Sequence, residues 1–424
     1  MIIRKSKSSE ARPTSVTVIG AGIGGLSAAA ALAHAGLDVT VLEAHIYPGG
    51  CAATFRYQGH WFDAGATVAA GFYPDGPMQL LGRAANIASW PVQPLEVPMV
   101  VHLPTGIVVE RWADERRWTT YAQIFPKSLH FWRWQEATAA YLWDYALRLP
   151  ELRPTSWRTA AQTAQITLQW LLQQRPAPRL FAELFRPLQH HLPNDPLFQQ
   201  FIDAQLLIAA QGTAQQVFAL YGAAALDLPN RGVVEVTGGI GSLAWQLVDS
   251  VRRHGGQVLF RQEVSRITPL ARGWLVTTNR GLELRADVVI ANLTPWALAR
   301  IWSTAPSAFL KHVTQPPRGW SAFVLYLSLD AALIPPGLPL HHQVVTGFPL
   351  GEGNSVFVSL SPEWDRTRGP SHRRVATLST HTNYQPWWEL AASDAAAYEE
   401  RKAQYQARLL ESAAAALPWL PQAV

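Results

Sequence analysis

The pattern of apolar and polar positions near the start of the chain predicts a strand, a turn, a helix and a second strand. Residues 16–19 are uncharged and rich in β-branched side chains, as a parallel strand covered on both faces requires. Apolar residues then recur at helical spacing over 26–33, and Gly36 follows as a C-terminal cap. A second apolar run, 39–42, ends on Glu43. The polar and basic residues that precede this unit, 1–15, are expected to form a disordered leader.

The rest of the chain alternates between helical and extended patterns. Residues 118–226 are typical of helices separated by prolines, and another helix is predicted after Gly241, with Ser242 as its N-cap. A last helix is predicted at 396–415. The extended patterns predict a hairpin at 100–109 and strands at 258–260, 263–267, 274–278, 286–292 (a buried one), 322–329, 355–360 and 374–380.

The turn after the first strand carries a glycine pattern that indicates a dinucleotide. Gly20, Gly22 and Gly25 have the G-x-G-x-x-G spacing, which allows a tight turn, close approach of a pyrophosphate, and close packing of helix on strand. The helix start favours a phosphate, and Glu43 lies where a ribose hydroxyl is bound. A signal peptide or membrane span is the alternative, because basic residues precede an uncharged run at 16–37. Four glycines in six positions would make a poor apolar core for such a segment.

A second glycine region favours FAD over a nicotinamide cofactor. Residues 48–51 read Pro-Gly-Gly-Cys, and 62–67 read Phe-Asp-Ala-Gly-Ala-Thr. A domain that binds only a nicotinamide cofactor does not need a second stretch of close backbone approach, whereas a flavin dinucleotide reaches further. The later segments around 232–292 are predicted to complete the same domain.

Composition narrows the class of protein. The 424 residues are enough for two or three domains, and 48% hydrophobic against 15% charged residues indicates a packed protein of unusually apolar character. The formal charge of +5 has no dense Lys/Arg block, so nucleic acid is not a predicted partner. Cys51 is the single cysteine, which excludes an intramolecular disulfide and favours a reducing, intracellular setting. The 18 tryptophans are interpreted mainly as core residues, with an aromatic cavity or a membrane-interface surface as the alternative.

These motifs resemble those of the carotenoid desaturase and isomerase family of flavoproteins. The residues that carry the resemblance are Gly20–Gly25, Glu43, Pro48–Cys51, Phe62–Thr67, Gly238–Leu243, Glu263–Val264, Asn292 and Pro295. The likeness is greatest to the bacterial carotenoid 3′,4′-desaturases. Cys51 stands where many related flavoproteins have Arg, which favours the isomerase-like and 3′,4′-desaturase branches.

The resemblance implies an α/β fold: a discontinuous Rossmann-type FAD-binding domain of the two-dinucleotide-binding type, with an α+β substrate domain of helices over a mixed sheet. The FAD-binding domain is expected at 16–98 and 228–298, and the substrate domain at 99–227 and 299–424. The family's closing Gly-Asp segment has no counterpart after Trp388, so we expect either a fragment or incomplete FAD binding. Noncovalent FAD is expected to contact Gly20, Ala21, Gly22, Ile23, Gly24, Gly25, Glu43, Ala44, Gly49, Gly50, Cys51, Ala66, Thr67, Val264 and Asn292.

No catalytic acid or base is assigned from the sequence. A polyene offers no carbonyl or phosphate, so the flavin takes the hydride and the protein positions the substrate. Asp63 is expected to hold backbone or cofactor. The adjacent histidines at 190–191 and 341–342 lack metal-ligand spacing, and Ser242 is not in a nucleophile elbow, so neither a metal site nor a hydrolase is predicted.

The predicted function is FAD-dependent desaturation of a carotenoid by a cytoplasmic protein at the membrane surface. A carotene cis–trans isomerase or polyene reductase on the same scaffold is one alternative, and a non-catalytic flavin- or isoprenoid-binding protein is another. An amine oxidase is less favoured, because no aromatic cage for an amine can be located. The carotenoid, the bond, the electron acceptor and the oligomeric state are not predicted.

Overall fold

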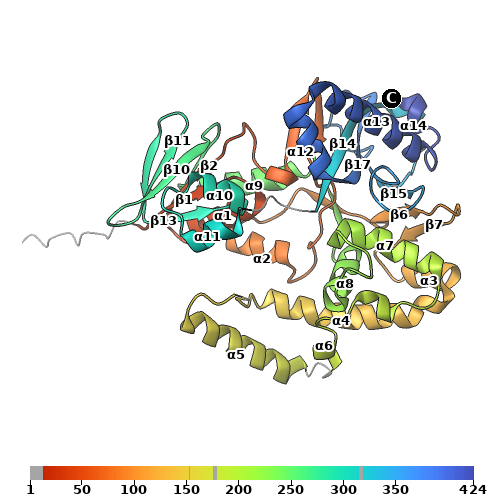
Figure 1. Ribbon diagram of the computed structural model, residues 1–424, viewed down its shortest axis with the longest axis horizontal. Helices are drawn as coiled ribbons and strands as arrows, with labels where there is room; N and C mark the ends of the chain where they lie inside the picture. The colour runs from red at the N-terminus through yellow and green to blue at the C-terminus, as the bar shows by residue number, and fades with distance from the viewer. Residues whose placement is uncertain (1–12, 152, 175–178, 315–318) are drawn as a thin grey trace, which may run out of the picture.

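The computed structural model describes residues 13–151, 153–174, 179–314 and 319–424 (Figure 1). Its first sheet is the parallel one that the sequence predicts. The strands run in the order β13-β1-β2-β9, and every neighbouring pair is parallel. They are β1 (Ser15–Ile19), β2 (Asp38–Leu42), β9 (Gln257–Leu259) and β13 (Val288–Ala291). The chain order reverses between β1 and β13, which is where ligands bind in open α/β sheets.

Helices cover one face of this sheet, and a small antiparallel sheet covers the other. The helices are α1 (Ile23–His34), α2 (Pro77–Ala84) and α9 (Gly241–Arg253), and the small sheet consists of β10 (Val264–Pro269), β11 (Trp274–Thr278) and β12 (Glu283–Ala286). Leu247, Val248 and Val251 of α9 are buried, as their spacing predicts. Gly36 ends α1 with φ +88°, and the Gly36 and Leu37 N–H groups bond back to Ala33 and Leu32 in a Schellman cap.

A six-stranded mixed sheet forms the second layer. Its order is β14-β17-β16-β15-β6-β7, and only the β15–β6 pair is parallel. The strands are β6 (Met99–His102), β7 (Val108–Arg111), β14 (Trp320–Asp330), β15 (His341–Val345), β16 (Ser355–Leu360) and β17 (Arg373–Asn383). The predicted hairpin at 100–109 is therefore confirmed as β6 and β7.

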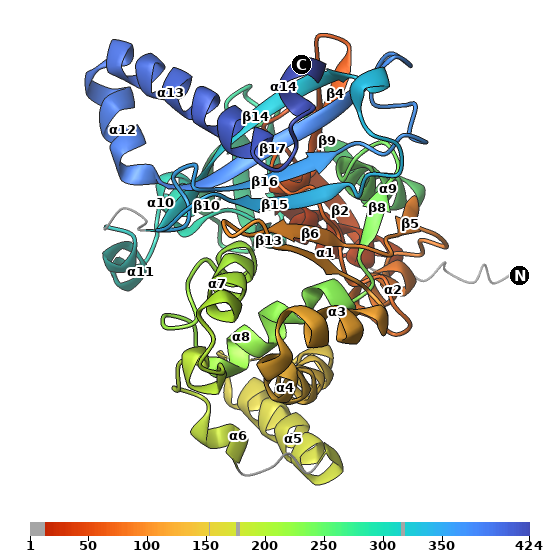
Figure 2. The same ribbon diagram turned by 90° about the vertical axis from the view of Figure 1, so that its right-hand side faces the viewer.

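Helices pack on both sides of the mixed sheet, as Figure 2 shows. Above it lie α12 (Tyr384–Ser393), α13 (Ala395–Ala414) and α14 (Leu420–Ala423). Below it is the helical lobe: α3 (Arg116–Ile124), α4 (Leu129–Leu147), α5 (Trp157–Gln174), α6 (Arg179–Ala182), α7 (Pro196–Ala210) and α8 (Ala219–Leu226). The remaining elements are β3 (Thr54–Tyr57), β4 (His60–Asp63), β5 (Val92–Pro94), β8 (Val234–Val236), α10 (Pro295–Ile301), α11 (Ser307–His312) and five short 3₁₀ turns: η1 (Gly50–Ala52), η2 (Pro126–Ser128), η3 (Leu188–His191), η4 (Leu228–Asn230) and η5 (Ala331–Leu333).

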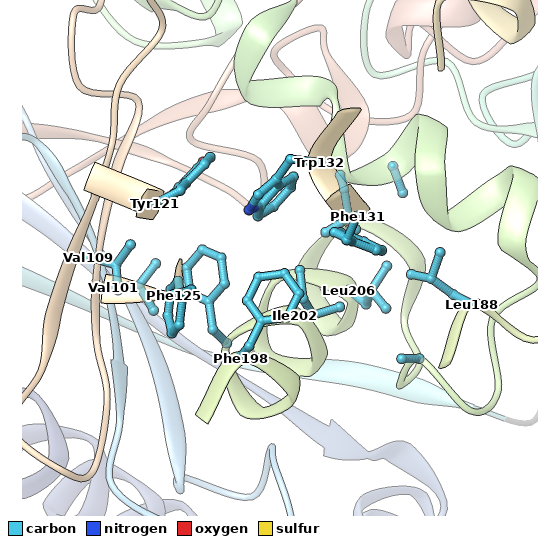
Figure 3. Packing of buried hydrophobic residues seen from close by; sticks show 14 of the residues in the cluster. Val101, Val109, Tyr121, Phe125, Phe131, Trp132, Leu188, Phe198, Ile202 and Leu206 are labelled. Atoms are coloured by element: carbon cyan, nitrogen blue, oxygen red, sulfur yellow. The ribbon is translucent and has the colours of Figure 1, made fainter. Parts of the chain in front are cut away.

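An aromatic core joins the helical lobe to the mixed sheet. Tyr121 and Trp132 stack with ring centroids 4.6 Å apart, and Phe125, Phe198 and neighbouring rings pack around them (Figure 3). Trp132 is 2% exposed, as the core interpretation of the tryptophans requires, whereas Trp157 on α5 is 92% exposed. In the described part of the chain, no helix is both long and apolar enough to span a bilayer.

Two local predictions are wrong, and several predicted strand ends shift by one to three residues. Residues 286–292 are not one buried strand: Ala286 ends β12, and the next strand, β13, lies at the edge of the parallel sheet with Val288 43% exposed. β1 begins one residue earlier than predicted, because Ser15 pairs with Asp38 and its hydroxyl bonds Asp287. Ser242 is not the N-cap of α9: the N-cap is Ile240, and the helix begins at Gly241. Residues 1–12 of the predicted leader lie outside the described part, and the domain boundaries stay a prediction.

Candidate cofactor site

The first wall of the site is the glycine turn between β1 and α1. Gly20 has φ +95°, a conformation that side-chain-bearing residues rarely adopt. A Cβ on Gly25 would press into the Gly20 carbonyl oxygen, and one on Gly22 would come within 2.8 Å of the Asn292 side-chain nitrogen. Gly20 and Gly25 therefore have room only for glycine, and the turn brings bare backbone to the end of the sheet.

The start of α1 is open to an anion. Its N-cap is Gly22, no side chain caps the helix, and its first turn carries no acidic residue. Gly24 is exposed. The first N–H groups of a helix lack intrahelical partners and carry the positive end of its dipole, so this end favours a phosphate.

Glu43 lies at the end of β2 and holds the glycine turn. Its Oε2 accepts the Ala21 N–H at 2.7 Å, and its Oε1 accepts the His45 N–H at 2.9 Å. The residue is 9% exposed and still borders the cavity. Because a carboxylate offers about four lone-pair positions, acceptor capacity remains for ligand hydroxyls.

The second glycine pair lies directly against the first turn. The Gly49 N–H donates to the Ala21 carbonyl at 2.8 Å, and Gly22 and Gly49 form a parallel bridge. Gly49 has φ +116°, and the exposed Gly50 and Cys51 follow as the opposite wall. The structure thus brings together the two glycine regions that the sequence analysis treated as parts of one site.

A cavity of about 570 Å³ opens between these walls at the carboxyl ends of β1, β2 and β13. Of the predicted contacts, it is lined by Gly20, Gly22, Ile23, Gly24, Glu43, Ala44, Gly49, Gly50, Cys51, Val264 and Asn292. Sequence reasoning missed further lining residues: Gln262, Glu263, Leu293, Ala297 and Arg300. Arg300 is on α10, and the only sequence signal for it is Pro295, which marks a helix start directly after the predicted corner at Asn292.

Four predicted contacts do not line this cavity. Ala21 and Gly25 are buried behind the turn. Ala66 and Thr67 lie beyond Cys51, to which they are linked by the Ala66 N–H donating to the Cys51 carbonyl at 2.9 Å. Ala66 is exposed and Thr67 is half-buried, so both continue the wall past the cavity.

Asp63 holds backbone, as predicted. Its Oδ1 accepts the Ile240 N–H at 3.0 Å and the Thr54 hydroxyl at 2.6 Å, while Thr54 Oγ1 accepts the Gly241 N–H at 2.8 Å. These two side chains cap α9 from a distant part of the chain, and Ser242 lies inside the first turn of the helix. Arg368 pairs with Asp63 Oδ2 at 2.9 Å and balances its charge.

Tyr326 fixes the turn that carries Ala66 and Thr67. Its hydroxyl donates to the Ala64 carbonyl at 2.7 Å, and its ring packs against Phe55 with centroids 5.1 Å apart. Burial raises the pKa of Tyr326 to about 12, so its hydroxyl stays a donor at neutral pH.

The fold and the site define a dinucleotide-binding protein whose cradle has a second glycine wall. A family model described as flavin containing amine oxidoreductase matches residues 23–404. The chain belongs to the flavin containing amine oxidoreductase family, and it is an FAD-dependent oxidoreductase. The predicted fold class and cofactor are confirmed.

Relatives and a solved structure agree with this assignment. The chain is 25% identical to prolycopene isomerase 1, chloroplastic, of an Oncidium hybrid cultivar over 430 residues, covering 93% of this chain and 68% of the relative. It is 31% identical to phytoene desaturase (lycopene-forming) of Paracoccus sp. over 291 residues, covering 65% of this chain and 54% of the relative. An oxidoreductase from Methanosarcina mazei has the same fold, with a TM-score of 0.59 at 19% identity over 93% of this chain and 84% of that one. The resemblance drawn from the motifs is thereby confirmed.

Proposed function

We propose that the protein acts in carotenoid biosynthesis and desaturates a long apolar polyene by transferring a hydride to FAD. The cavity built from two glycine turns, Glu43 and Asn292 carries the cofactor part of the proposal. Relatives named as a phytoene desaturase and prolycopene isomerases support the substrate class. When bound, FAD supplies the hydride acceptor.

The residues of the chain bind FAD and orient it. We infer that the start of α1 receives the pyrophosphate and that Glu43 accepts the ribose hydroxyls. The bare backbone at Gly50 and Cys51, continued by Ala66 and Thr67, leads from the cavity toward the mixed sheet and would hold the flavin end. Arg300 adds a positive charge at the cavity wall.

Isomerisation is the second candidate, because a specific observation favours it. The prolycopene isomerases match 93% of this chain, whereas the desaturase matches 65%. A polyene reductase and a non-catalytic flavin-binding role are the remaining possibilities on this scaffold.

One experiment separates these functions. Protein purified with added FAD is first examined for flavin absorbance, and is then incubated in detergent micelles with a hydrogenated carotene and, separately, with a poly-cis carotene. If the protein is a desaturase, the hydrogenated carotene should gain conjugated double bonds and the flavin absorbance should bleach. The incubation is repeated with FAD reduced by dithionite, which supplies the electrons that a reductase needs. Geometric isomers as the only products would indicate an isomerase, loss of double bonds would indicate a reductase, and a protein without flavin absorbance would contradict all three.

We also propose that the far end of the helical lobe binds the membrane from which an apolar substrate is drawn. The exposed apolar side chains of the lobe include Trp157 (92% exposed) and Leu172 (67%) on α5, and Phe185 (81%) shortly after α6. The exposed Arg153 and Arg158 suit an anionic bilayer surface. Figure 2 shows α5 and α6 farthest from the mixed sheet.

The test is sedimentation with anionic phospholipid vesicles. Burying one large apolar side chain is worth about 2 kcal/mol, so Trp157→Ser with Phe185→Ser should weaken binding about a thousandfold. Trp388→Ser is the matched control, because Trp388 is 72% exposed but lies on α12, on the other side of the mixed sheet. Equal binding by the double variant and the unaltered protein would contradict the proposal.

A further inference from the structure

Four side chains from distant segments form a row of polar contacts that ends at the wall of the site. The Thr67 and Ser359 hydroxyl oxygens are 2.7 Å apart, and Ser359 Oγ is 3.0 Å from His341 Nδ1. The other ring nitrogen of His341, Nε2, is 3.4 Å from Oε2 of Glu235. Ser359 is on β16, His341 on β15 and Glu235 on β8, so only the tertiary fold brings them together.

The inner end of the row is dry and has no other partner. Glu235 is 6% exposed and His341 1%, and among the described residues neither Glu235 Oε2 nor His341 Nε2 has a hydrogen-bond partner, so their contact at 3.4 Å is the one polar approach that each atom makes. A buried carboxylate beside an imidazole is costly unless the two share a proton or a charge. The two side chains therefore form one buried polar unit.

The charged groups around this unit are accounted for. Asp63 and Arg368 border the same small polar cavity and neutralise each other at 2.9 Å. Arg374 lies close enough for its charge to act on Glu235, and it donates to the Ser361 carbonyl. Glu235 is the carboxylate that lies against His341 Nε2, at 3.4 Å, and it also feels the charge of Arg374.

The outer end of the row reaches the cofactor site. Thr67 follows Ala66, whose N–H is bonded to the carbonyl of Cys51, and Cys51 lines the cavity. A hydrolytic triad is excluded because Ser359 is 6% exposed and its hydroxyl is bonded to Thr67. The row instead connects a half-buried hydroxyl at the site with a buried base.

We propose that Thr67, Ser359 and His341 form a proton relay that accepts the proton released when the substrate is desaturated. Glu235 stabilises the positive charge that His341 then carries. This inference rests on the proposed function. Each desaturation breaks two C–H bonds: one hydrogen leaves with its electron pair to FAD, and the neighbouring carbon releases a proton.

One proton moves along the relay, and each hydroxyl gives up one hydrogen and gains one. The resting unit has a Glu235 carboxylate and a neutral His341 that carries its hydrogen on Nε2. Thr67 Oγ1 takes the substrate proton while its own hydrogen passes to Ser359 Oγ, and the Ser359 hydrogen passes to His341 Nδ1. The product is an imidazolium beside the carboxylate, with both hydroxyls restored.

The relay makes a prediction about His341 that can be tested without turnover. Nδ1 must be unprotonated in the resting protein, since it accepts from Ser359. NMR of holoprotein containing nitrogen-labelled histidine, assigned by comparison with His341→Gln, should show the Nε2–H tautomer of His341. A proton on Nδ1 would overturn the proposal. His342→Gln serves as the matched control, because His342 is next on the same strand but pairs with His102 at 3.1 Å.

The relay also predicts a kinetic separation. General base catalysis contributes about a hundredfold or more, so Ser359→Ala should slow bleaching of bound FAD by a hydrogenated carotene about a hundredfold with KM unchanged. Ser359→Thr keeps the hydroxyl and should restore the rate. Equal rates for Ser359→Ala and the unaltered protein would overturn the relay. If the unaltered protein shows no flavin absorbance or makes no desaturated product, the proposed function itself fails, which is seen before any variant is made.

Discussion

Replacing Glu43 by Gln tests whether one carboxylate both holds the glycine turn and binds the cofactor. In the structure its two oxygens accept the N–H groups of Ala21 at 2.7 Å and His45 at 2.9 Å. A glutamine keeps one acceptor oxygen and turns an NH₂ group toward the other N–H. Because a hydrogen bond to a charged group is worth about 1.5–3 kcal/mol, the free energy of unfolding of the FAD-free protein should fall by about 2–3 kcal/mol.

The same substitution should weaken FAD binding. Removing the charged acceptor for the ribose hydroxyls is expected to raise the Kd about tenfold to a hundredfold, which corresponds to about 1.4–2.8 kcal/mol. Urea unfolding of the FAD-free protein measures the structural effect, and titration of FAD fluorescence measures the binding effect.

The control for this prediction is Glu263→Gln. Glu263 lines the same cavity and carries the same charge, but its Oε2 accepts the Asn279 side chain at 3.3 Å and lies outside the glycine turn. Unfolding and FAD binding that are both unchanged in Glu43→Gln would refute the reasoning. Equal losses in the two variants would show that only the charge of the cavity matters.

Three further substitutions test the glycine turn, a buried hydrogen-bond network and a buried histidine. Gly25→Ala places a Cβ against the Gly20 carbonyl, so it should cost about 1–3 kcal/mol of stability and the protein should lose FAD on gel filtration; retained flavin would contradict this. Arg111→Met leaves the Gln205 side-chain oxygen and one backbone carbonyl without a donor in the core, so urea unfolding should show a loss of about 2–4 kcal/mol rather than an unchanged midpoint. Burial lowers the pKa of His342 from 6.5 to about 4. The stability that the neutral, buried His342 contributes is fully present above pH 6.5 and is lost as pH falls from 6.5 toward 4. His342→Gln should reduce that loss by roughly 3 kcal/mol, and a parallel decline in both proteins would argue against the burial effect.

Much of the cofactor cradle could be predicted because its constraints are local. A positive φ at Gly20 and close helix–strand contact at Gly25 require glycine, so the spacing appears in the sequence. Glu43 could be predicted because it comes directly after the apolar run of the second strand. The closeness of Asn292 was expected only from the family resemblance.

Other parts of the site depend on contacts that no local pattern encodes. Ser242 has the chemistry of an N-cap, yet Asp63 and Thr54 cap α9 from far along the chain. The apolar run 286–292 divides because its two ends pair with different sheets. Arg300 was missed because an arginine on a short helix has no distinctive spacing.

The sequence by itself determined the β-α-β unit, its glycine turn, its acid and the expectation of FAD, because backbone sterics and hydrophobic periodicity act over a few residues. Only the tertiary structure decided which surfaces face the cavity, which side chains cap α9, and that Thr67, Ser359, His341 and Glu235 form one row. Hydrogen bonds between distant segments exist only after the sheets and helices have packed, and that packing is a property of the whole chain.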